Sequence, residues 1–288
     1  MKRIVGIVFS LLFCMSLTGC FKRDNFEGIN IYTTVYPIEY IVERLYGEHS
    51  NISSIYPDGV DINDYELTEK QITDYSKTTL FTFNGLGEEK KYVNEFFKHN
   101  KRLKIIDTTS SMEYLNGMEE LWLDPSNFLM MVQNIRYGLK EYINNHYLKN
   151  EIDEKYNKLK EEISKLDADI YEISDNSSNK TLIVSSDLLK FLEKYNFTVI
   201  SLEENENLTE KTLVTVENLI NDGSVHYIIM LQGEEPSETI KKIIEDTNIE
   251  LVYFHLITNL TGEERNLKKD YISLMSENID LIRNEVYD

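Results

Sequence analysis

The chain has 288 residues, of which 41% are hydrophobic, so it can bury the core of one large domain or two small ones. Its 50 Asp and Glu residues against 30 Lys and Arg residues give a net charge of −20. An acidic excess of this size leaves no basic stripe for a phosphate backbone, so we do not expect nucleic acid as a partner.

The N-terminus has the pattern of a bacterial signal peptide. Lys2 and Arg3 precede an apolar stretch over residues 4–17. This stretch is shorter than the roughly 20 residues that a transmembrane helix needs. It ends in Leu17-Thr18-Gly19-Cys20, which resembles the lipobox of bacterial lipoproteins. We therefore predict cleavage before Cys20 and attachment of a lipid to its thiol.

Cleavage at this point defines the mature chain. Residues 1–20 are the predicted signal peptide and residues 21–28 a tether behind the lipid. Cys14 leaves with the signal peptide, so Cys20 is the only cysteine left and no intramolecular disulfide or structural cysteine–metal site is possible. Loss of Lys2 and Arg3 leaves 28 basic against 50 acidic residues, a net charge of −22. We expect an extracytoplasmic protein anchored to the cell membrane.

After the tether, β-rich apolar runs alternate with helical patterns. Strands are predicted over residues 29–35, 51–56, 78–83 and 103–107, and helices over residues 37–46, 68–75 and 88–98. Alternation with short connections favours a parallel sheet with helices on its faces. We assign residues 29–124 to an N-terminal lobe.

Residues 125–172 have helical spacing throughout. Pro125 is followed by no further proline in this stretch, glycine occurs only at Gly138, and the later part is rich in alternating charges. We expect one long linker helix, with Asn144 and Asn145 as the point where it would break. An ordinary helical hairpin is the alternative.

Strand–helix alternation then resumes over residues 173–288, the predicted C-terminal lobe. Strands are predicted over residues 181–185, 198–202, 226–231 and 250–254, and helices over residues 187–195, 209–221, 236–246 and 263–286. The predicted fold class is α/β, with two lobes that each contain a mainly parallel four-stranded sheet with flanking helices, joined by one long linker helix.

Five stretches, taken in order, connect the chain to one family. They are Thr33-Thr34-Val35-Tyr36-Pro37, residues 56–68 (Tyr-Pro-Asp-Gly-Val-Asp-Ile-Asn-Asp-Tyr-Glu-Leu-Thr), Phe83-Asn84-Gly85-Leu86-Gly87, residues 121–127 (Leu-Trp-Leu-Asp-Pro-Ser-Asn) and residues 270–278 (Asp-Tyr-Ile-Ser-Leu-Met-Ser-Glu-Asn). In order and spacing the chain resembles the zinc/manganese solute-binding lipoproteins of ABC importers, from about residue 29 to residue 281.

The resemblance implies two α/β lobes joined by a single long helix, with the metal ion in the cleft between them. It also implies the partners: an ABC permease in the membrane with its cytoplasmic ATPase, and a zinc or manganese ion as the transported ligand. The cleft position agrees with the rule that open α/β sheets bind ligands beyond the carboxyl ends of their strands.

The family's metal ligands are three histidines and a carboxylate, or two of each, and this chain departs from that set. The matching positions hold Asn63, Glu120, Ser185 or Ser186 with Asp187 beside them, and His255. None of the family's histidines stands where the resemblance expects it, and His255 occupies the position of the family's final carboxylate.

The predicted metal ligands are therefore Asn63, Glu120, Asp187 and His255. Nearby carboxylates are Glu39, Asp61, Asp64 and Glu66. Oxygen donors with one imidazole suit hard or borderline ions such as Mn²⁺ and still permit Zn²⁺. The structural alternatives are that Asp187 caps a helix and that His255 is a satisfied structural histidine.

Two other functions remain open at this point: the same fold with a different solute, and a surface adhesin or interaction protein with a degenerate metal site. Ser186, Asp187 and His255 invite comparison with a catalytic triad, but the chain has no Gly-x-Ser-x-Gly motif. It also has neither a phosphate-binding glycine loop nor a His-Glu-x-x-His motif. We expect no enzymatic activity and no catalytic cofactor.

Overall fold

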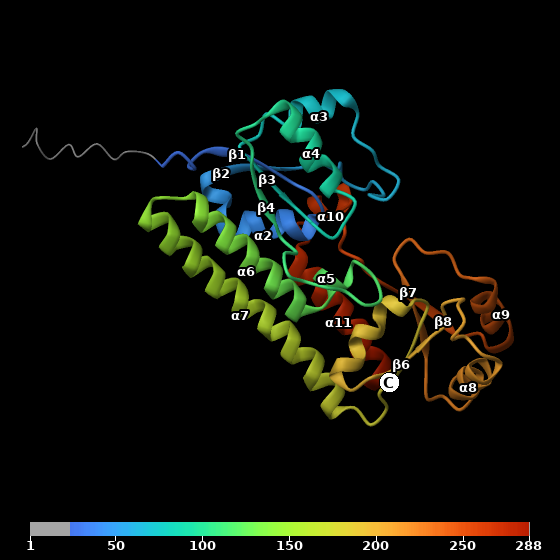
Figure 1. The fold of residues 1–288 in the computed structure, drawn as a ribbon. Helices are drawn as coiled ribbons and strands as arrows, with labels where there is room; N and C mark the ends of the chain where they lie inside the picture. The colour runs from blue at the N-terminus through green and yellow to red at the C-terminus, as the bar shows by residue number, and fades with distance from the viewer. Residues whose placement is uncertain (1–23, 288) are drawn as a thin grey trace, which may run out of the picture.

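The computed structural model describes residues 24–287 and consists of two α/β lobes (Figure 1). The predicted signal peptide and Cys20 lie outside the described residues. No helix within residues 24–287 is long and apolar enough to cross a membrane.

Each lobe contains one four-stranded, fully parallel sheet. The order is β2-β1-β3-β4 in the N-terminal lobe and β6-β5-β7-β8 in the C-terminal lobe. The strands are β1 Ile29–Thr33, β2 Ser50–Ser54, β3 Leu80–Phe83, β4 Lys104–Asp107, β5 Thr181–Val184, β6 Thr198–Ser201, β7 Tyr227–Leu231 and β8 Glu250–Phe254. The predicted α/β class, with a parallel four-stranded sheet in each of two lobes, is confirmed.

Local sequence signals fix most of the flanking helices. Pro37 lies in the first turn of the helix after β1, and Thr68 forms a capping box with Gln71 before the helix after β2. The elements are α2 Tyr36–Tyr46, η1 Gly47–His49, α3 Glu69–Tyr75, α4 Lys90–His99, α5 Glu120–Leu123, η2 Asp187–Tyr195, α8 Glu210–Asn221 and α9 Glu238–Thr247. The predicted helix over residues 187–195 is a 3₁₀-helix.

The stretch predicted as one linker helix is a pair of helices, α6 Pro125–Tyr142 and α7 His146–Asn176. Ile143 and Asn145 are extended, and the Asn145 side chain caps α7. The chain reverses there, so α6 and α7 lie side by side (Figure 1). The long connection between lobes is α7 alone, whose 31 residues contact α2 of the N-terminal lobe and α11 of the C-terminal lobe.

The predicted helix over residues 263–286 is also divided, into α10 Gly262–Asn266 and α11 Tyr271–Tyr287. Between them Lys268 has a φ of 55°, in the left-handed region that a continuous helix cannot accommodate. The break directs α10 toward the N-terminal lobe, while α11 packs against α7 and β5.

The motif at residues 121–127 forms the core between the lobes. Trp122 is fully buried; its indole N–H donates to the carbonyl of Leu256, and its own carbonyl accepts from the Tyr271 hydroxyl at 2.6 Å. The Tyr271 ring stacks on Phe128 of α6. The motif therefore joins the start of α6 to the segments on either side of α10.

The second half of the predicted tether packs on the N-terminal lobe. Phe26 is buried and stacks on Tyr142, and Asp24 accepts hydrogen bonds from the backbone of Asn144 and Asn145. These contacts hold the turn between α6 and α7.

Candidate functional site

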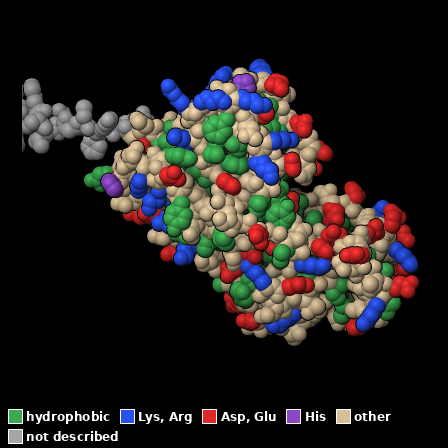
Figure 2. Space-filling model, viewed as in Figure 1, with side chains coloured by type: hydrophobic (Ala, Val, Ile, Leu, Met, Phe, Trp, Pro, Cys, Tyr) green, Lys and Arg blue, Asp and Glu red, His purple; other side chains and the backbone are tan. Residues whose placement is uncertain are grey.

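A cavity of about 320 Å³ lies between the two lobes. On the side of the N-terminal lobe, residues 59–63 and Glu119 line it. On the other side, residues 232–233, 255–261 and Glu264 line it. Apart from Glu119, these segments follow the carboxyl ends of strands or continue from them, which is where open parallel sheets bind ligands. The face drawn in Figure 2 has an indentation between the lobes, with many carboxylates on the lobe below it.

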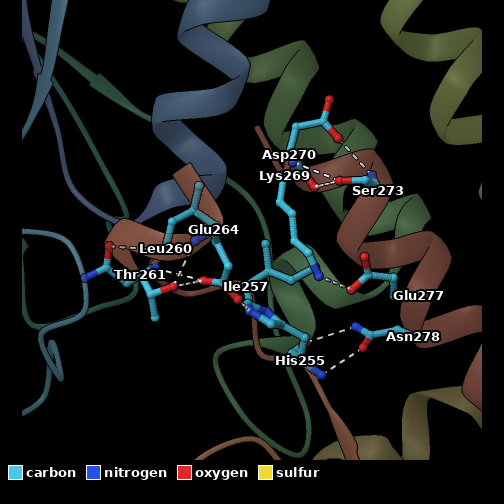
Figure 3. Close-up of polar contacts among 11 residues, drawn as sticks. His255, Ile257, Leu260, Thr261, Glu264, Lys269, Asp270, Ser273, Glu277 and Asn278 are labelled. Carbon is cyan, nitrogen blue, oxygen red and sulfur yellow. Dashed lines mark hydrogen bonds and ion pairs between the residues drawn. The ribbon is translucent and has the colours of Figure 1, made fainter. Parts of the chain in front are cut away.

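His255 directly follows β8 and lies in the cavity wall, and both of its ring nitrogens have hydrogen-bond partners (Figure 3). Nδ1 accepts the backbone N–H of Ile257 at 2.8 Å, and Nε2 lies 2.9 Å from Oε1 of Glu264. Because Nδ1 accepts, the neutral ring carries its proton on Nε2 and donates it to Glu264. To bind an ion, the ring must give up one of these two contacts.

Burial lowers the pKa of His255 below its ordinary value, and the hydrogen bond to Glu264 opposes this only in part. For Glu264, burial alone would raise the pKa, but hydrogen bonds from Thr261 and His255 outweigh it and the pKa is lowered. The pair is therefore a neutral imidazole donating to a carboxylate at neutral pH.

The backbone of His255 is held by Asn278 of α11. The His255 N–H donates to Oδ1 of Asn278 at 2.7 Å, and the Asn278 amide returns a hydrogen bond to the His255 carbonyl at 2.9 Å (Figure 3). Asn278 is buried, so this two-bond clamp fixes the end of β8 against the last helix.

Asn63 also lines the cavity, from the loop after β2. Its side chain is exposed, and its backbone N–H donates to Asp61 within the same turn. Of the four predicted ligands, the structure thus brings Asn63 and His255 to one cavity.

Glu120 does not line the cavity. It is 8% exposed, and its Oε2 accepts the backbone N–H groups of Leu115 and Asn116 at 3.2 and 3.1 Å. Its neighbour Glu119 lines the cavity instead. Successive helical residues point about 100° apart, so only one of the two carboxylates can face the cavity.

Asp187 lies at the first position of η2, outside the cavity lining. Its carboxylate pairs with Lys190 at 2.8 Å and accepts from Asn205 at 3.3 Å. Burial alone would raise its pKa, but the Lys190 ammonium and the hydrogen bonds outweigh it, and the pKa is lowered. At the alternative position, the Ser185 hydroxyl donates to Glu234 at 2.5 Å.

Two of the four nearby carboxylates also pair with basic side chains. Glu39 is buried and pairs with Arg265, while Glu66 pairs with Lys91. Across residues 24–287 there is no group of three or more His, Cys, Asp or Glu side chains close enough together to hold a metal ion in this conformation.

Sequence reasoning missed two carboxylates of the cavity wall, Glu119 and Glu264. A signal for Glu264 was available: Thr261 and Glu264 have the Thr-x-x-Glu spacing of a capping box, which the structure contains at the start of α10. No feature of the sequence indicated that Glu119, and not Glu120, would face the cavity, because this depends on the orientation of α5.

Comparison with known proteins identifies a family model and relatives that match most of the chain. A family model described as "Zinc-uptake complex component A periplasmic" matches residues 31–285. The chain is 24% identical over 307 residues to the metal ABC transporter substrate-binding lipoprotein ScbA of Streptococcus cristatus, covering 98% of each chain. It is 26% identical over 237 residues to a putative metal-binding protein of Chlamydia trachomatis, covering 78% of this chain and 84% of that one.

Among solved structures, the Zn(II)-bound ZnuA-like domain of Streptococcus pneumoniae AdcA has a TM-score of 0.72 at 18% identity, covering 91% of this chain and all of that domain. The fold and the cavity between the lobes are those of a two-lobed solute-binding protein. Because the family model matches most of its length, the chain belongs to the family of periplasmic A components of zinc-uptake complexes.

Proposed function

We propose that this protein is the extracytoplasmic metal-binding subunit of an ABC importer. It captures a zinc or manganese ion between its lobes and delivers it to a membrane permease driven by a cytoplasmic ATPase. The observation that carries this proposal is the cavity lined from both lobes in a chain of this family, because closure of the lobes would enclose a small solute. The lipobox-like motif ending at Cys20 supports anchoring to the membrane by a lipid.

The proposed ligands are Asn63, Glu120, Asp187 and His255. Asn63 and His255 already line the cavity. Glu120 would have to release the amides of its loop and Asp187 would have to release Lys190, so we propose that these two join the ion only after their loops move.

Manganese and zinc are the ions that the donors favour. A set of oxygen donors with one imidazole is harder than a three-histidine set, which suits Mn²⁺ and still permits Zn²⁺. Relatives include a manganese ABC transporter substrate-binding lipoprotein of Streptococcus anginosus, 24% identical over 312 residues, which supports the same range.

A second candidate keeps the fold and changes the solute. It is favoured by the absence, within residues 24–287, of any three-ligand cluster and by the two hydrogen bonds that occupy the His255 ring. In that case the polar wall formed by Asn63, Glu119 and His255 would bind a small polar solute through hydrogen bonds.

Thermal melting of the purified protein with added Mn²⁺ or Zn²⁺ tests the proposal. An ion at a hundredfold excess over its dissociation constant stabilises the folded state by about 2.7 kcal/mol, which raises the melting temperature. We expect His255→Ala to lose most of this rise. His99→Ala is the matched control, because His99 is exposed on α4, away from the cavity lining, and should keep the rise.

Equal rises in the wild type and both variants would place the ion elsewhere. If the ions do not raise the melting temperature of the wild type and an organic molecule co-purifies with the protein, the second candidate, a different solute, would be favoured.

A further inference from the structure

The segment between β8 and α11 belongs to the C-terminal lobe by sequence but docks on the N-terminal lobe. We call residues 256–266 the strap. The backbone N–H of Tyr36 donates to the Thr258 carbonyl at 2.9 Å, and that of Gly59 donates to the Leu260 carbonyl at 2.8 Å. These two bonds join the strap to the start of α2 and to the loop after β2, one of the cavity walls.

The strongest contact of the strap is an ion pair across the lobes. Arg265 of α10 donates two hydrogen bonds to Glu39 of α2, at 2.9 and 3.0 Å, and a third to Asp58 at 2.6 Å. Its guanidinium also lies over the Tyr36 ring. Glu39 is only 6% exposed. A bidentate arginine–carboxylate pair with one buried partner is among the stronger polar contacts in proteins, and loss of Arg265 would leave the buried Glu39 carboxylate without this partner.

The base of the strap is held in a strained conformation. Ile257, a fully buried β-branched residue, has a φ of 58°, in a region that such side chains avoid. Its N–H is held by the His255 ring, and His255 is clamped in turn by Asn278. The backbone therefore turns sharply at the point where the chain leaves the C-terminal sheet for the other lobe.

The geometry points to the strap as a latch that holds the two lobes together beside the cavity, with the contacts of Arg265 to Glu39 and Asp58 setting how readily the lobes separate. The latch itself does not depend on the proposed function. Only its expected effect on the release of a bound ion rests on that function. The strap supplies one cavity wall and binds residues next to the other, so separation of Arg265 from Glu39 would part the two walls. The positioning role of Arg265 is thus distinct from that of any ligand.

The test compares Arg265→Gln and Glu39→Gln with the wild type and with Arg283→Gln. Arg283 pairs with Asp280 within α11, so its loss removes an arginine–carboxylate pair that does not join the lobes. Amide hydrogen exchange reports opening directly. We expect the amides of Tyr36 and Gly59 to exchange at least tenfold faster in the first two variants, while amides of β5 keep the wild-type rate.

With Mn²⁺ bound, a chelator added by stopped flow measures ion release. We expect release at least tenfold faster in Arg265→Gln and Glu39→Gln, with an association rate within about twofold of the wild type, because related variants differ mainly in dissociation. Unchanged exchange at Tyr36 and Gly59 would overturn the latch. Equal acceleration in β5 would also overturn it, since that result describes general loss of stability.

The proposed function and the latch can be contradicted independently of each other. A wild type that binds no ion contradicts the proposed function, while the exchange experiment, which needs no ion, still decides the latch.

Discussion

Glu89 offers a direct test of the electrostatics of a buried carboxylate in the N-terminal lobe. It precedes α4 in the loop after β3, is 2% exposed, and neither of its carboxylate oxygens accepts a hydrogen bond from another described residue. The carboxylate lies against Gly87, where a Cβ atom would meet Oε2 at 1.8 Å, and near the sulfur of Met118. Burial without a partner raises its pKa to about 7, and the charges of Glu88 and Glu119 add to the effect.

The sign and size of the consequence follow from proton linkage. The folded state holds the Glu89 proton more tightly than the unfolded state, whose carboxyl has its ordinary pKa of 4.5. Stability is therefore lost as the pH rises from about 5 through 7. At about 1.4 kcal/mol for each tenfold difference in proton affinity, this group removes roughly 2.5 kcal/mol of folding free energy between pH 5 and pH 8.

Glu89→Gln removes the titration while keeping the shape of the side chain. Any fixed cost of burying the amide is the same at both pH values, so the diagnostic quantity is the change in unfolding free energy between pH 5 and pH 8. Between pH 5 and pH 8, the unfolding free energy of Glu89→Gln should fall by about 2.5 kcal/mol less than that of the wild type, as measured by urea unfolding. Glu245→Gln is the control, since Glu245 is exposed on α9 of the other lobe. Parallel pH profiles for Glu89→Gln and the wild type would refute the reasoning.

Two further changes have defined outcomes. Asn278→Ala removes both hydrogen bonds that clamp His255 and should destabilise the protein by about 2–4 kcal/mol in urea unfolding. Asn218→Ala, on an exposed position of α8, should cost less than about 1 kcal/mol, and equal costs for the two variants would contradict the clamp. Cys20→Ala should either leave the membrane fraction or keep its signal peptide; a variant that is cleaved normally and stays in the membrane would show that the anchor is not at Cys20.

The sequence predicted most of the strands well because most are short apolar runs with clear punctuation, although β2 is largely polar. β8 was predicted at its observed limits, and β1 was predicted two residues too long because Val35 already turns into α2. The same reasoning failed where helices break without glycine or proline. Lys268 adopts a left-handed φ in a run of charged residues, which offers no signal for the separation of α10 from α11.

The position of the α6–α7 turn was predictable from the sequence, but the reversal of the chain there was not. Asn144 and Asn145 marked a weak point, and Asn145 does cap α7. Whether the second helix continues or reverses depends on tertiary contacts, here those of Asp24 with the turn and the apolar stripe of α7 against α6.

The candidate site was predictable only where strand order determined it. His255 lies at the cavity because it directly follows β8, and ligands of open parallel sheets bind beyond the carboxyl ends of the strands. The partners of Glu120 and Asp187 could not be derived in this way. Backbone amides of a loop and a lysine one helical turn away decide where those carboxylates point.

These partners bear on how the cleft would work. Each hydrogen bond to a charged group contributes about 1.5–3 kcal/mol, so an ion that recruits Glu120 and Asp187 must replace the bonds from Leu115, Asn116 and Lys190. A cation that makes few but strong contacts with carboxylates offsets that loss better than a neutral solute does. Glu120 and its partners lie in the N-terminal lobe and Asp187 with Lys190 in the C-terminal lobe, so an ion that recruited both carboxylates would bridge the two lobes. Ion binding and movement of the lobes are therefore expected to be coupled, and the Arg265–Glu39 pair is one of the contacts that such a movement would strain.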